Sequence, residues 1–202
     1  MINDAKIGVI ILAAGFSSRL GYAKQLVEFK GKSLLQHAID VSDLLDFDSK
    51  VVVLGARFEK ILDKIDAKDF EIVINEHWEE GMSTSIRAGV SRSQKSNNDL
   101  KYLLILLSDQ PFVSREKIEE LIRIQLESKS PAIFSEYAGN VGVPAIFSAE
   151  VFAYLKTLKG DQGAKKLIND KKFDFETVKF EEGNFDVDTT EDIELLKQLE
   201  KE

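Results

Sequence analysis

The chain has 202 residues, a length that fits one large domain. It contains no cysteine, which excludes disulfides and cysteine-ligated zinc or iron–sulfur sites. The formal net charge of −8 argues against a nucleic-acid-binding surface, because such a surface needs many cations to neutralise phosphates. An acidic protein can still bind a triphosphate where a few cations and main-chain N–H groups converge.

The sequence shows no targeting or membrane segment. Residues 1–6 lead straight into a short apolar run, without the pattern of a signal peptide. No apolar run approaches the roughly 20 residues that a membrane-spanning helix needs. We therefore expect a cytoplasmic protein with neither a membrane nor a nucleic acid as partner.

Apolar runs and helix-period segments alternate along the chain. Continuous apolar runs of this kind are typical of strands buried on both faces of a parallel sheet. Strand–helix alternation predicts right-handed βαβ units, and hence an α/β fold: a three-layer α/β/α sandwich with a Rossmann-like, mostly parallel sheet. In chain order the pattern predicts strands at 7–13, 50–54, 70–75, 102–107 and 131–135, and intervening helices at 33–45, 57–65, 83–91 and 114–127.

The last third of the chain is less regular. Pro144 lies within the strand-like run 141–147, which predicts an edge position or a bulge. Helices are predicted at 149–155 and 189–202, and the polar stretch 91–99 is predicted to be a surface loop. No Pro/Gly/Ser-rich linker and no internal repeat divides the chain, so residues 1–202 are predicted to form a single domain.

The segment after the first strand has the composition of a phosphate-binding loop. Ligands of open α/β sheets bind beyond the carboxyl ends of the strands, which is where residues 14–24 are expected to lie. Small residues let main-chain N–H groups approach phosphate oxygens. Arg19 and Lys24 add positive charge, and Ser17 and Ser18 can add hydroxyls. An ordinary glycine-containing turn explains this composition equally well.

Two better-known phosphate motifs do not fit the chain. Gly31-Lys32-Ser33 has the ending of a P-loop, but Leu26 stands where the first glycine is required. Gly15 is followed by Phe16 and Ser17, which fails the dinucleotide fingerprint.

Carboxylates follow two of the later segments. Asp109 comes directly after the strand at 102–107 and could bind Mg²⁺ there, or could cap the helix that starts near Ser114. Asp186 and Asp188 would point to the same face of a strand, although Asp188 or Thr189 would also make a good helix N-cap.

A third group of polar residues, Gly81-Met82-Ser83-Thr84-Ser85, lies between a strand and a helix. A helix N-terminus with hydroxyls suits phosphate binding, and a plain helix start capped by Ser83 is the alternative.

The string Leu12-Ala-Ala-Gly-Phe-Ser-Ser-Arg-Leu-Gly-Tyr-Ala-Lys-Gln-Leu26 closely resembles the signature of the MobA-like NTP-transferase family, and within it the molybdenum cofactor cytidylyltransferase branch. The string Ser108-Asp-Gln-Pro111 resembles the family's metal-binding motif, and Asp186-Val-Asp-Thr-Thr-Glu-Asp192 resembles its C-terminal motif. Gly81-Met82-Ser83 also resembles this branch. The matches occur in the expected order over nearly the whole chain.

This resemblance implies a Mg²⁺-dependent nucleotidyltransferase that transfers CMP from CTP to the phosphate of molybdopterin and releases pyrophosphate. It assigns catalysis to Arg19 and Lys24, which stabilise the departing pyrophosphate, and Mg²⁺ binding to Asp109 and Asp188. A recipient molybdoenzyme is an expected partner. The implied nucleotide-binding residues are Leu12, Ala13, Ala14, Gly15, Ser17, Ser18, Arg19, Lys24, Asn75, Ser83, Ser85 and Ser108.

Three details bear on the substrates. Ala13-Ala14 stands where the guanylyl branch tends to have Gly-Gly, which favours cytosine. The string 160–163, Gly-Asp-Gln-Gly, matches one on the side that receives the second substrate. Val143 replaces the histidine that usually precedes the proline, which weakens the assignment of a pterin acceptor.

Other functions remain open from the sequence. They are a guanylyl- or sugar-phosphate nucleotidyltransferase on the same scaffold, a metal-dependent glycosyltransferase using Asp186 and Asp188, and a non-catalytic binding module that retains the fold.

Overall fold

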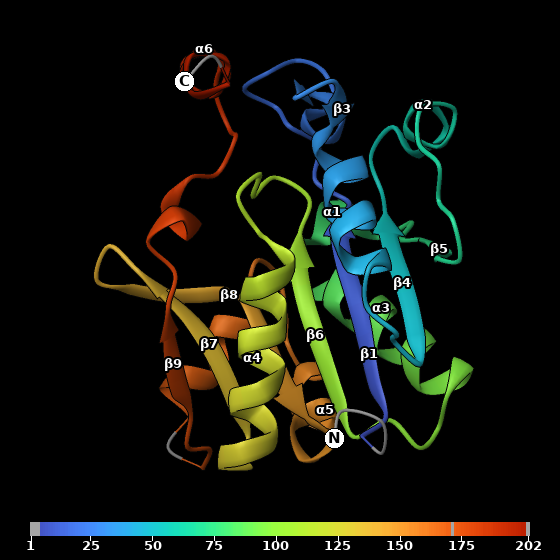
Figure 1. Cartoon of the computed structure of the whole chain (residues 1–202). Coiled ribbons are helices and arrows are strands. Elements are labelled where there is room, and N and C mark those ends of the chain that lie inside the picture. Colours follow the sequence, from blue (N-terminus) through green and yellow to red (C-terminus); the bar gives the residue numbers. More distant parts are fainter. Residues whose placement is uncertain (1–4, 171, 201–202) are drawn as a thin grey trace.

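The computed structural model describes residues 5–170 and 172–200. A seven-stranded sheet in the order β5-β4-β1-β6-β8-β7-β9 runs through its centre, with helices on both faces (Figure 1). The strands of this sheet are β1 (Ile7–Ala13), β4 (Ser49–Leu54), β5 (Glu71–Ile74), β6 (Tyr102–Leu107), β7 (Ala132–Tyr137), β8 (Asn140–Ser148) and β9 (Glu176–Lys179). The helices are α1 (Leu34–Asp43), α2 (Phe58–Leu62), α3 (Met82–Ser96), α4 (Arg115–Ser128), α5 (Phe152–Leu155) and α6 (Thr190–Leu199).

The sheet is mostly parallel, as predicted. β5, β4, β1 and β6 are mutually parallel neighbours, β8 is antiparallel to both β6 and β7, and β9 is parallel to β7. The carboxyl ends of β1, β4 and β6 therefore lie side by side at the same end of the sheet. A short hairpin of β2 (Glu28–Phe29) and β3 (Lys32–Ser33), together with the 3₁₀ segment η1 (Lys24–Leu26), leads from β1 into α1.

Strand β1 is buried on both faces because helices cover the sheet on both sides. Alternate residues divide between two core clusters: Val9 and Ile11 enter the first, and Ile10 and Leu12 enter the second. Every residue of β1 is buried. A continuous apolar strand is stable here because water reaches neither face, and each buried Leu or Ile contributes about 1.5–3 kcal/mol.

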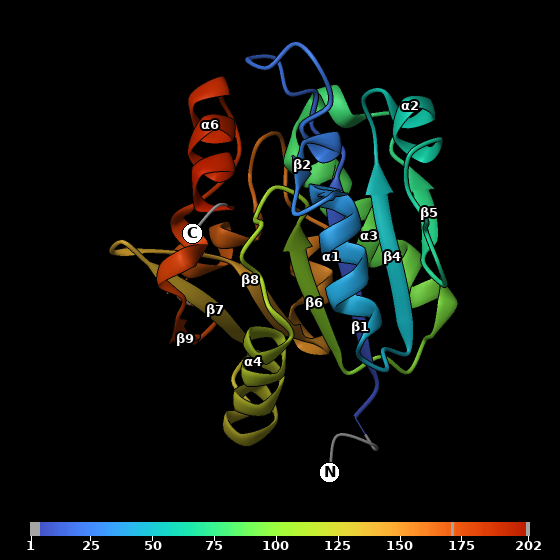
Figure 2. The same cartoon turned by 45° about the horizontal axis from the view of Figure 1, so that its top comes forward.

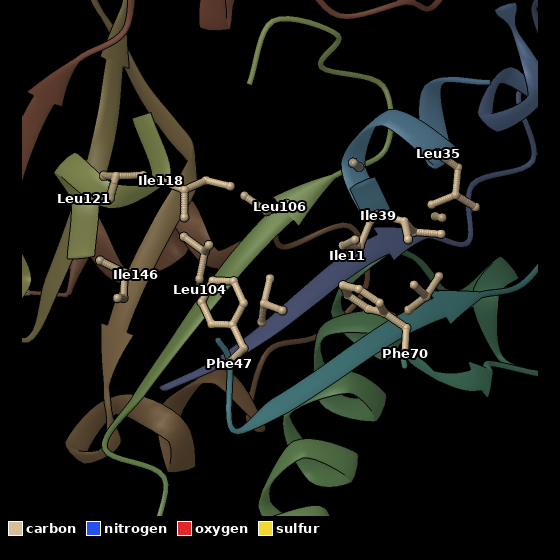
Figure 3. Packing of buried hydrophobic residues seen from close by; sticks show 14 of the residues in the cluster. Ile11, Leu35, Ile39, Phe47, Phe70, Leu104, Leu106, Ile118, Leu121 and Ile146 are labelled. Atoms are coloured by element: carbon tan, nitrogen blue, oxygen red, sulfur yellow. The ribbon is translucent and has the colours of Figure 1, made fainter. Parts of the chain in front are cut away.

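Two layers of helices cover the sheet. The first core cluster lies between the sheet and helices α1 and α4, which contribute Leu35 and Ile39, and Ile118 and Leu121, respectively (Figure 3). The second cluster lies on the opposite face, under α3 and α5. The arrangement is the predicted three-layer sandwich.

The C-terminal segment returns to the end of the sheet that is formed by the carboxyl ends of the parallel strands. Val187 and α6 residues Ile193 and Leu196 pack against Val27 and Phe29 in a third, smaller cluster. Figure 2 shows α6 at the same end of the molecule as the β2–β3 hairpin. This packing brings Asp188 to the edge of the sheet where β1 ends.

One sequence-based expectation needs correction, and another is met by one of its two alternatives. Helix α3 continues to Ser96, so most of the predicted loop at 91–99 is helical; the segment has no Gly or Pro to end the helix, and its Ser93 is buried. β8 is an internal strand, not an edge strand, but the predicted bulge is present. Phe134 pairs with Ala145 and Ser135 with Gly142, which leaves 143–144 as the extra residues.

The predicted C-terminal helix at 189–202 is observed as α6, and positions 201–202 lie outside the described residues. Within the described part of the chain, none of the helices combines the length and the apolar character needed to cross a membrane.

Gly89 sets the distance between α3 and the sheet. A Cβ atom at this position would lie 2.7 Å from Ile10 Cγ2 and 3.2 Å from Val53 Cγ2. We predict that Gly89→Ala lowers the free energy of unfolding by about 1–3 kcal/mol, because the overpacking outweighs the better helix propensity of alanine. Urea unfolding followed by circular dichroism measures this.

Ser91→Ala is the matched control, because Ser91 is exposed on the same helix and only the propensity term applies. A Gly89→Ala variant as stable as Ser91→Ala would contradict the close packing of α3 on β1.

Candidate active site

A pocket of about 350 Å³ lies at the carboxyl ends of β1 and β6. Its volume falls within the range of roughly 300–1,000 Å³ that is usual for small-molecule sites. Residues from segments far apart in sequence meet in its wall. The predicted site residues that line it are Leu12, Ala13, Ala14, Gly15, Lys24, Ser85, Ser108 and Asp109.

The loop that follows β1, residues 14–23, folds back on itself around Ser17. The Ser17 carbonyl accepts hydrogen bonds from the N–H groups of Leu20 and Gly21, each at 3.2 Å. The Ser17 hydroxyl accepts one from the N–H of Lys24 at 3.0 Å. Ser17 therefore shapes the loop internally, while Ser18 and Arg19 are exposed at its tip.

This loop leaves a row of main-chain donors free. Within residues 5–170 and 172–200, no protein acceptor is in hydrogen-bonding range of the N–H groups of residues 15–19. Successive free N–H groups in a turn form a concave site for anions. A Cβ atom built on Gly15 would meet nothing within 4 Å. The fold itself therefore does not require glycine there, and the open space lies beside the free donors.

Lys24 joins the ends of two distant segments. Its ammonium forms ion pairs with Asp109, which follows β6, and with Asp188 Oδ1 at 2.6 Å, just before α6. The Lys24 side chain is only 17% exposed. Arg19 Nη1 approaches Asp188 Oδ2 at 3.5 Å from the exposed side. Two cations and two carboxylates predicted for the site thus lie in one cluster.

The charges in this cluster shift one another's protonation. Burial alone would lower the pKa of the Lys24 ammonium, but Asp109 and Asp188 outweigh burial and raise it, so Lys24 stays charged. Asp186 is exposed as a residue, yet burial of its carboxyl and the negative charge of Asp109 raise its pKa to about 6. With Asp186 beside it, the cluster brings three carboxyl groups together with two cations, Lys24 and the more exposed Arg19.

The capping roles considered for the aspartates belong to other residues. Helix α4 is capped by Ser114, whose hydroxyl accepts from the N–H of Lys117. Helix α6 is capped by Thr189 in a capping box with Asp192. The predicted metal-binding aspartates thus cap neither helix, and their carboxylates face Lys24.

The start of α3 forms another wall of the pocket. Gly81 precedes the helix with φ 103°, and a Cβ there would lie 2.4 Å from the carbonyl carbon of Gly160. Ser85 lines the pocket, and its hydroxyl accepts a hydrogen bond from Asn75 Nδ2 at 2.9 Å. Asn75 is buried and does not line the pocket, so it positions Ser85 from behind.

Ser83 differs from Ser85. It is fully buried, its N–H donates to the Gly160 carbonyl at 3.1 Å, and it does not line the pocket. Its main-chain N–H thus joins the start of α3 to the segment around Gly160, while its buried hydroxyl has no hydrogen-bond partner among the described residues. Ser18, Arg19 and Asp188 also lie outside the pocket lining, although Arg19 and Asp188 belong to the adjoining ion-pair cluster.

Several pocket residues were not predicted from the sequence. Phe16 and Trp78 stack with ring centroids 5.5 Å apart, and the Arg57 guanidinium lies 4.8 Å from the centre of the Phe16 ring. Asp161 also lines the pocket, and it belongs to the string 160–163 that was expected on the side of the second substrate. Gln25 lines the pocket as well; it belongs to the string that resembles the family signature, but no role was predicted for it there. The Phe16–Trp78 stack joins residues far apart in sequence, and no local pattern indicates it.

Gly15 allows a direct test of the loop. We predict that Gly15→Ala leaves the free energy of unfolding nearly unchanged, because the added methyl group meets no protein atom. It should weaken triphosphate binding at least about tenfold, equivalent to about 1.4 kcal/mol, since the methyl group occupies the space beside the free N–H groups. Calorimetric titration with inorganic tripolyphosphate, next to urea unfolding, measures both quantities. Unchanged binding would exclude Gly15 from the anion site.

Known proteins are similar to this chain in sequence and in fold. The purine catabolism protein PucB of Bacillus subtilis is 28% identical over 94% of this chain and 95% of its own length. A protein of Paenarthrobacter nicotinovorans named nicotine blue oxidoreductase is 26% identical over 94% of this chain and 93% of its own length.

Among solved structures, Rv0371c of Mycobacterium tuberculosis H37Rv superposes with a TM-score of 0.83 at 26% identity, covering 98% of this chain and 99% of its own. A structure of Rv0371c in complex with manganese has a TM-score of 0.78 at 26% identity, covering 96% of this chain and 99% of its own. The MobA-like NTP transferase domain matches residues 9–176. The chain therefore belongs to the MobA-like NTP transferase family, a family of nucleotidyltransferases.

Proposed function

We propose that this protein transfers CMP from CTP to the phosphate of molybdopterin, the organic part of the molybdenum cofactor, and releases pyrophosphate with Mg²⁺ as cofactor. The observation that carries the proposal is the junction of the free N–H groups of residues 15–19 with Lys24 and the carboxylates of Asp109 and Asp188. Anion donors, a buried cation and a metal-binding pair are the groups that nucleotidyl transfer requires.

The reaction needs positioning and charge neutralisation more than a protein nucleophile. An oxygen of the acceptor's phosphate forms a bond to the α-phosphorus of CTP. The bond from that phosphorus to the bridging oxygen of the β-phosphate breaks, and its electron pair leaves with pyrophosphate. The loop N–H groups would orient the triphosphate, and Lys24 and Arg19 would stabilise the charge that develops on the departing pyrophosphate.

The carboxylates fit a divalent cation. Asp109 Oδ1 is buried and has no hydrogen-bond partner among the described residues, while Oδ2 faces Lys24. Mg²⁺ at nucleotide sites uses one or two carboxylates, with water and phosphate oxygens as its other ligands. Among the described residues, no group of three or more His, Cys, Asp or Glu side chains is placed to hold a metal ion by itself, so Asp109 and Asp188 would need phosphate oxygens and water as the further ligands.

Bound Mg²⁺ would supply positive charge that stabilises the triphosphate and its leaving group. The manganese complex of Rv0371c supports a divalent cation in this fold.

Alanines in the pocket support a small base. Ala13 and Ala14 both line the pocket, where glycines would leave more room. A narrower floor favours the single ring of cytosine over the double ring of guanine. Ser85 lines the same pocket, and because its hydroxyl accepts from Asn75, its own proton is available to a ligand.

The identity of the acceptor substrate is inferred from the resemblance to the molybdenum cofactor branch, and not from a contact within the structure. Val143 occupies the position where the family usually has histidine, and its side chain packs against the second core cluster. This position therefore offers no polar side chain to an acceptor. The product would pass to a molybdoenzyme, in keeping with the branch that the chain resembles.

Nucleotide choice tests the proposal. We predict that the purified protein with Mg²⁺ binds CTP more tightly than GTP, UTP or ATP, and releases pyrophosphate only when molybdopterin is added. Quenching of Trp78, the chain's single tryptophan, reports binding because it lines the pocket. Binding of GTP without CTP would refute the cytidylyl assignment.

Other outcomes of the same assay identify the alternatives. Pyrophosphate release with a sugar phosphate would indicate a sugar-phosphate nucleotidyltransferase. Turnover of a nucleotide sugar without pyrophosphate would indicate a glycosyltransferase. Tighter binding of NADH than of any nucleoside triphosphate would favour the chemistry in the name of the Paenarthrobacter relative.

The metal assignment predicts a ranking of aspartate variants. Asp109→Asn and Asp188→Asn should each lower turnover by about 10²-fold or more, because each removes a charge that holds the cation beside the triphosphate. Asp186→Asn is the control two residues from Asp188, and it should lose much less, since Lys24 contacts Asp188 and Asp109 instead.

Circular dichroism and urea unfolding establish that each variant is folded. Equal losses of turnover in Asp186→Asn and Asp188→Asn would favour an Asp-x-Asp site. Undiminished activity of Asp109→Asn would exclude Asp109 as a metal ligand.

A further inference from the structure

Gln25 is buried directly beneath the loop that carries the free N–H groups. It is 1% exposed, lies in η1, and borders the pocket. Its amide nitrogen donates two hydrogen bonds, to the carbonyl of Ala13 at 2.8 Å and to the carbonyl of Gly15 at 3.0 Å. One side chain thus uses both of its donors on main-chain carbonyls at the start of the loop.

These two bonds determine the direction of the neighbouring N–H groups. In a planar trans peptide the C=O and N–H groups point to opposite sides. Because the carbonyls of Ala13 and Gly15 point toward Gln25, the N–H groups of Ala14 and Phe16 point away from it. The N–H of Phe16 has no protein acceptor among the described residues.

Gln25 also connects this orientation to Lys24. The two residues are consecutive, and the N–H of Lys24 donates to the Ser17 hydroxyl at 3.0 Å. The start of the loop is therefore attached to η1 through Gln25, and its middle is attached through Ser17. The loop with the free N–H groups and the main chain at Lys24 are therefore connected by hydrogen bonds before any ligand is present.

We infer that Gln25 is a positioning residue for the triphosphate: its amide group preorganises the loop donors and Lys24 without contacting the reacting atoms. This inference rests on the proposed function, since it concerns the same anion site. Preorganisation raises affinity because the loop does not have to be ordered when the ligand binds.

A second buried glutamine provides a matched control. Gln125 in α4 is fully buried, donates through Nε2 to the Ser130 carbonyl at 2.6 Å, and lies away from the pocket lining. Both glutamines have a buried Oε1 with no protein partner among the described residues. Replacing either by methionine keeps the length of the side chain and removes the buried donor.

We predict that Gln25→Met weakens binding of inorganic tripolyphosphate and of CTP at least about tenfold. Gln125→Met should bind both as the wild type does, although both variants unfold at lower urea concentration. Calorimetric titration measures the affinities. Amide hydrogen exchange adds a local readout, because residues 13–19 should exchange faster in Gln25→Met and not in Gln125→Met.

Gln25→Glu serves if the methionine variant does not fold, because it keeps the shape of the side chain and replaces the donor nitrogen by oxygen; since its carboxylate also repels a polyanion, amide exchange of residues 13–19 without ligand is its deciding readout. Wild-type affinity in a folded Gln25 variant, or equal losses in both glutamine variants, would overturn the positioning role alone. Failure of the wild-type protein to bind tripolyphosphate or any nucleotide would overturn the proposed function, and this inference with it.

Discussion

The ion-pair cluster around Lys24 is the interaction on which the site depends. It joins the end of the β1 loop, the end of β6 and the segment before α6, which are far apart in the sequence. Because Lys24 and Asp109 are both largely buried, each compensates the charge of the other, and the more exposed Asp188 adds a second carboxylate to Lys24. The raised pKa of Asp186 has the same origin, since it reflects burial and the negative charge of Asp109. A cation, the Lys24 ammonium, thus lies between Asp109 and Asp188 before any ligand binds.

The sheet explains why these groups meet. β1 and β6 are adjacent parallel strands, so the loop after Ala13 and the residues after Leu107 emerge at the same edge. The C-terminal segment reaches this edge because Val187 and α6 pack against the β2–β3 hairpin in the third apolar cluster. Helix α3 presents Ser85 to the same pocket, and its close packing through Gly89 sets that position. The apolar clusters thus bring together polar groups that lie far apart along the chain.

Much of the fold was predictable because it depends on local patterns. The continuous apolar runs at Ile7–Ala13 and Tyr102–Leu107 were predicted with their observed bounds, since a strand buried on both faces has no polar residues to blur its ends. The short strands β2, β3 and β9 were missed because their few residues carry no period. Helix α3 was predicted too short because its last turns are polar. For β8, Pro144 left two possibilities open, an edge strand or a bulge, and the structure has the bulge in an internal strand.

For the site, the sequence by itself determined which residue types are available and which of them follow the strands. It thereby indicated Gly15, Lys24 and Asp109, because parallel strands deliver their following residues to one edge. Only the tertiary structure decided that Ser85 faces the pocket while Ser83 is buried beside Gly160. Only it revealed the hydrogen bonds of the Gln25 side chain to the loop carbonyls. The physical reason is that these contacts depend on side-chain direction and on the distance between packed elements, which no local pattern encodes.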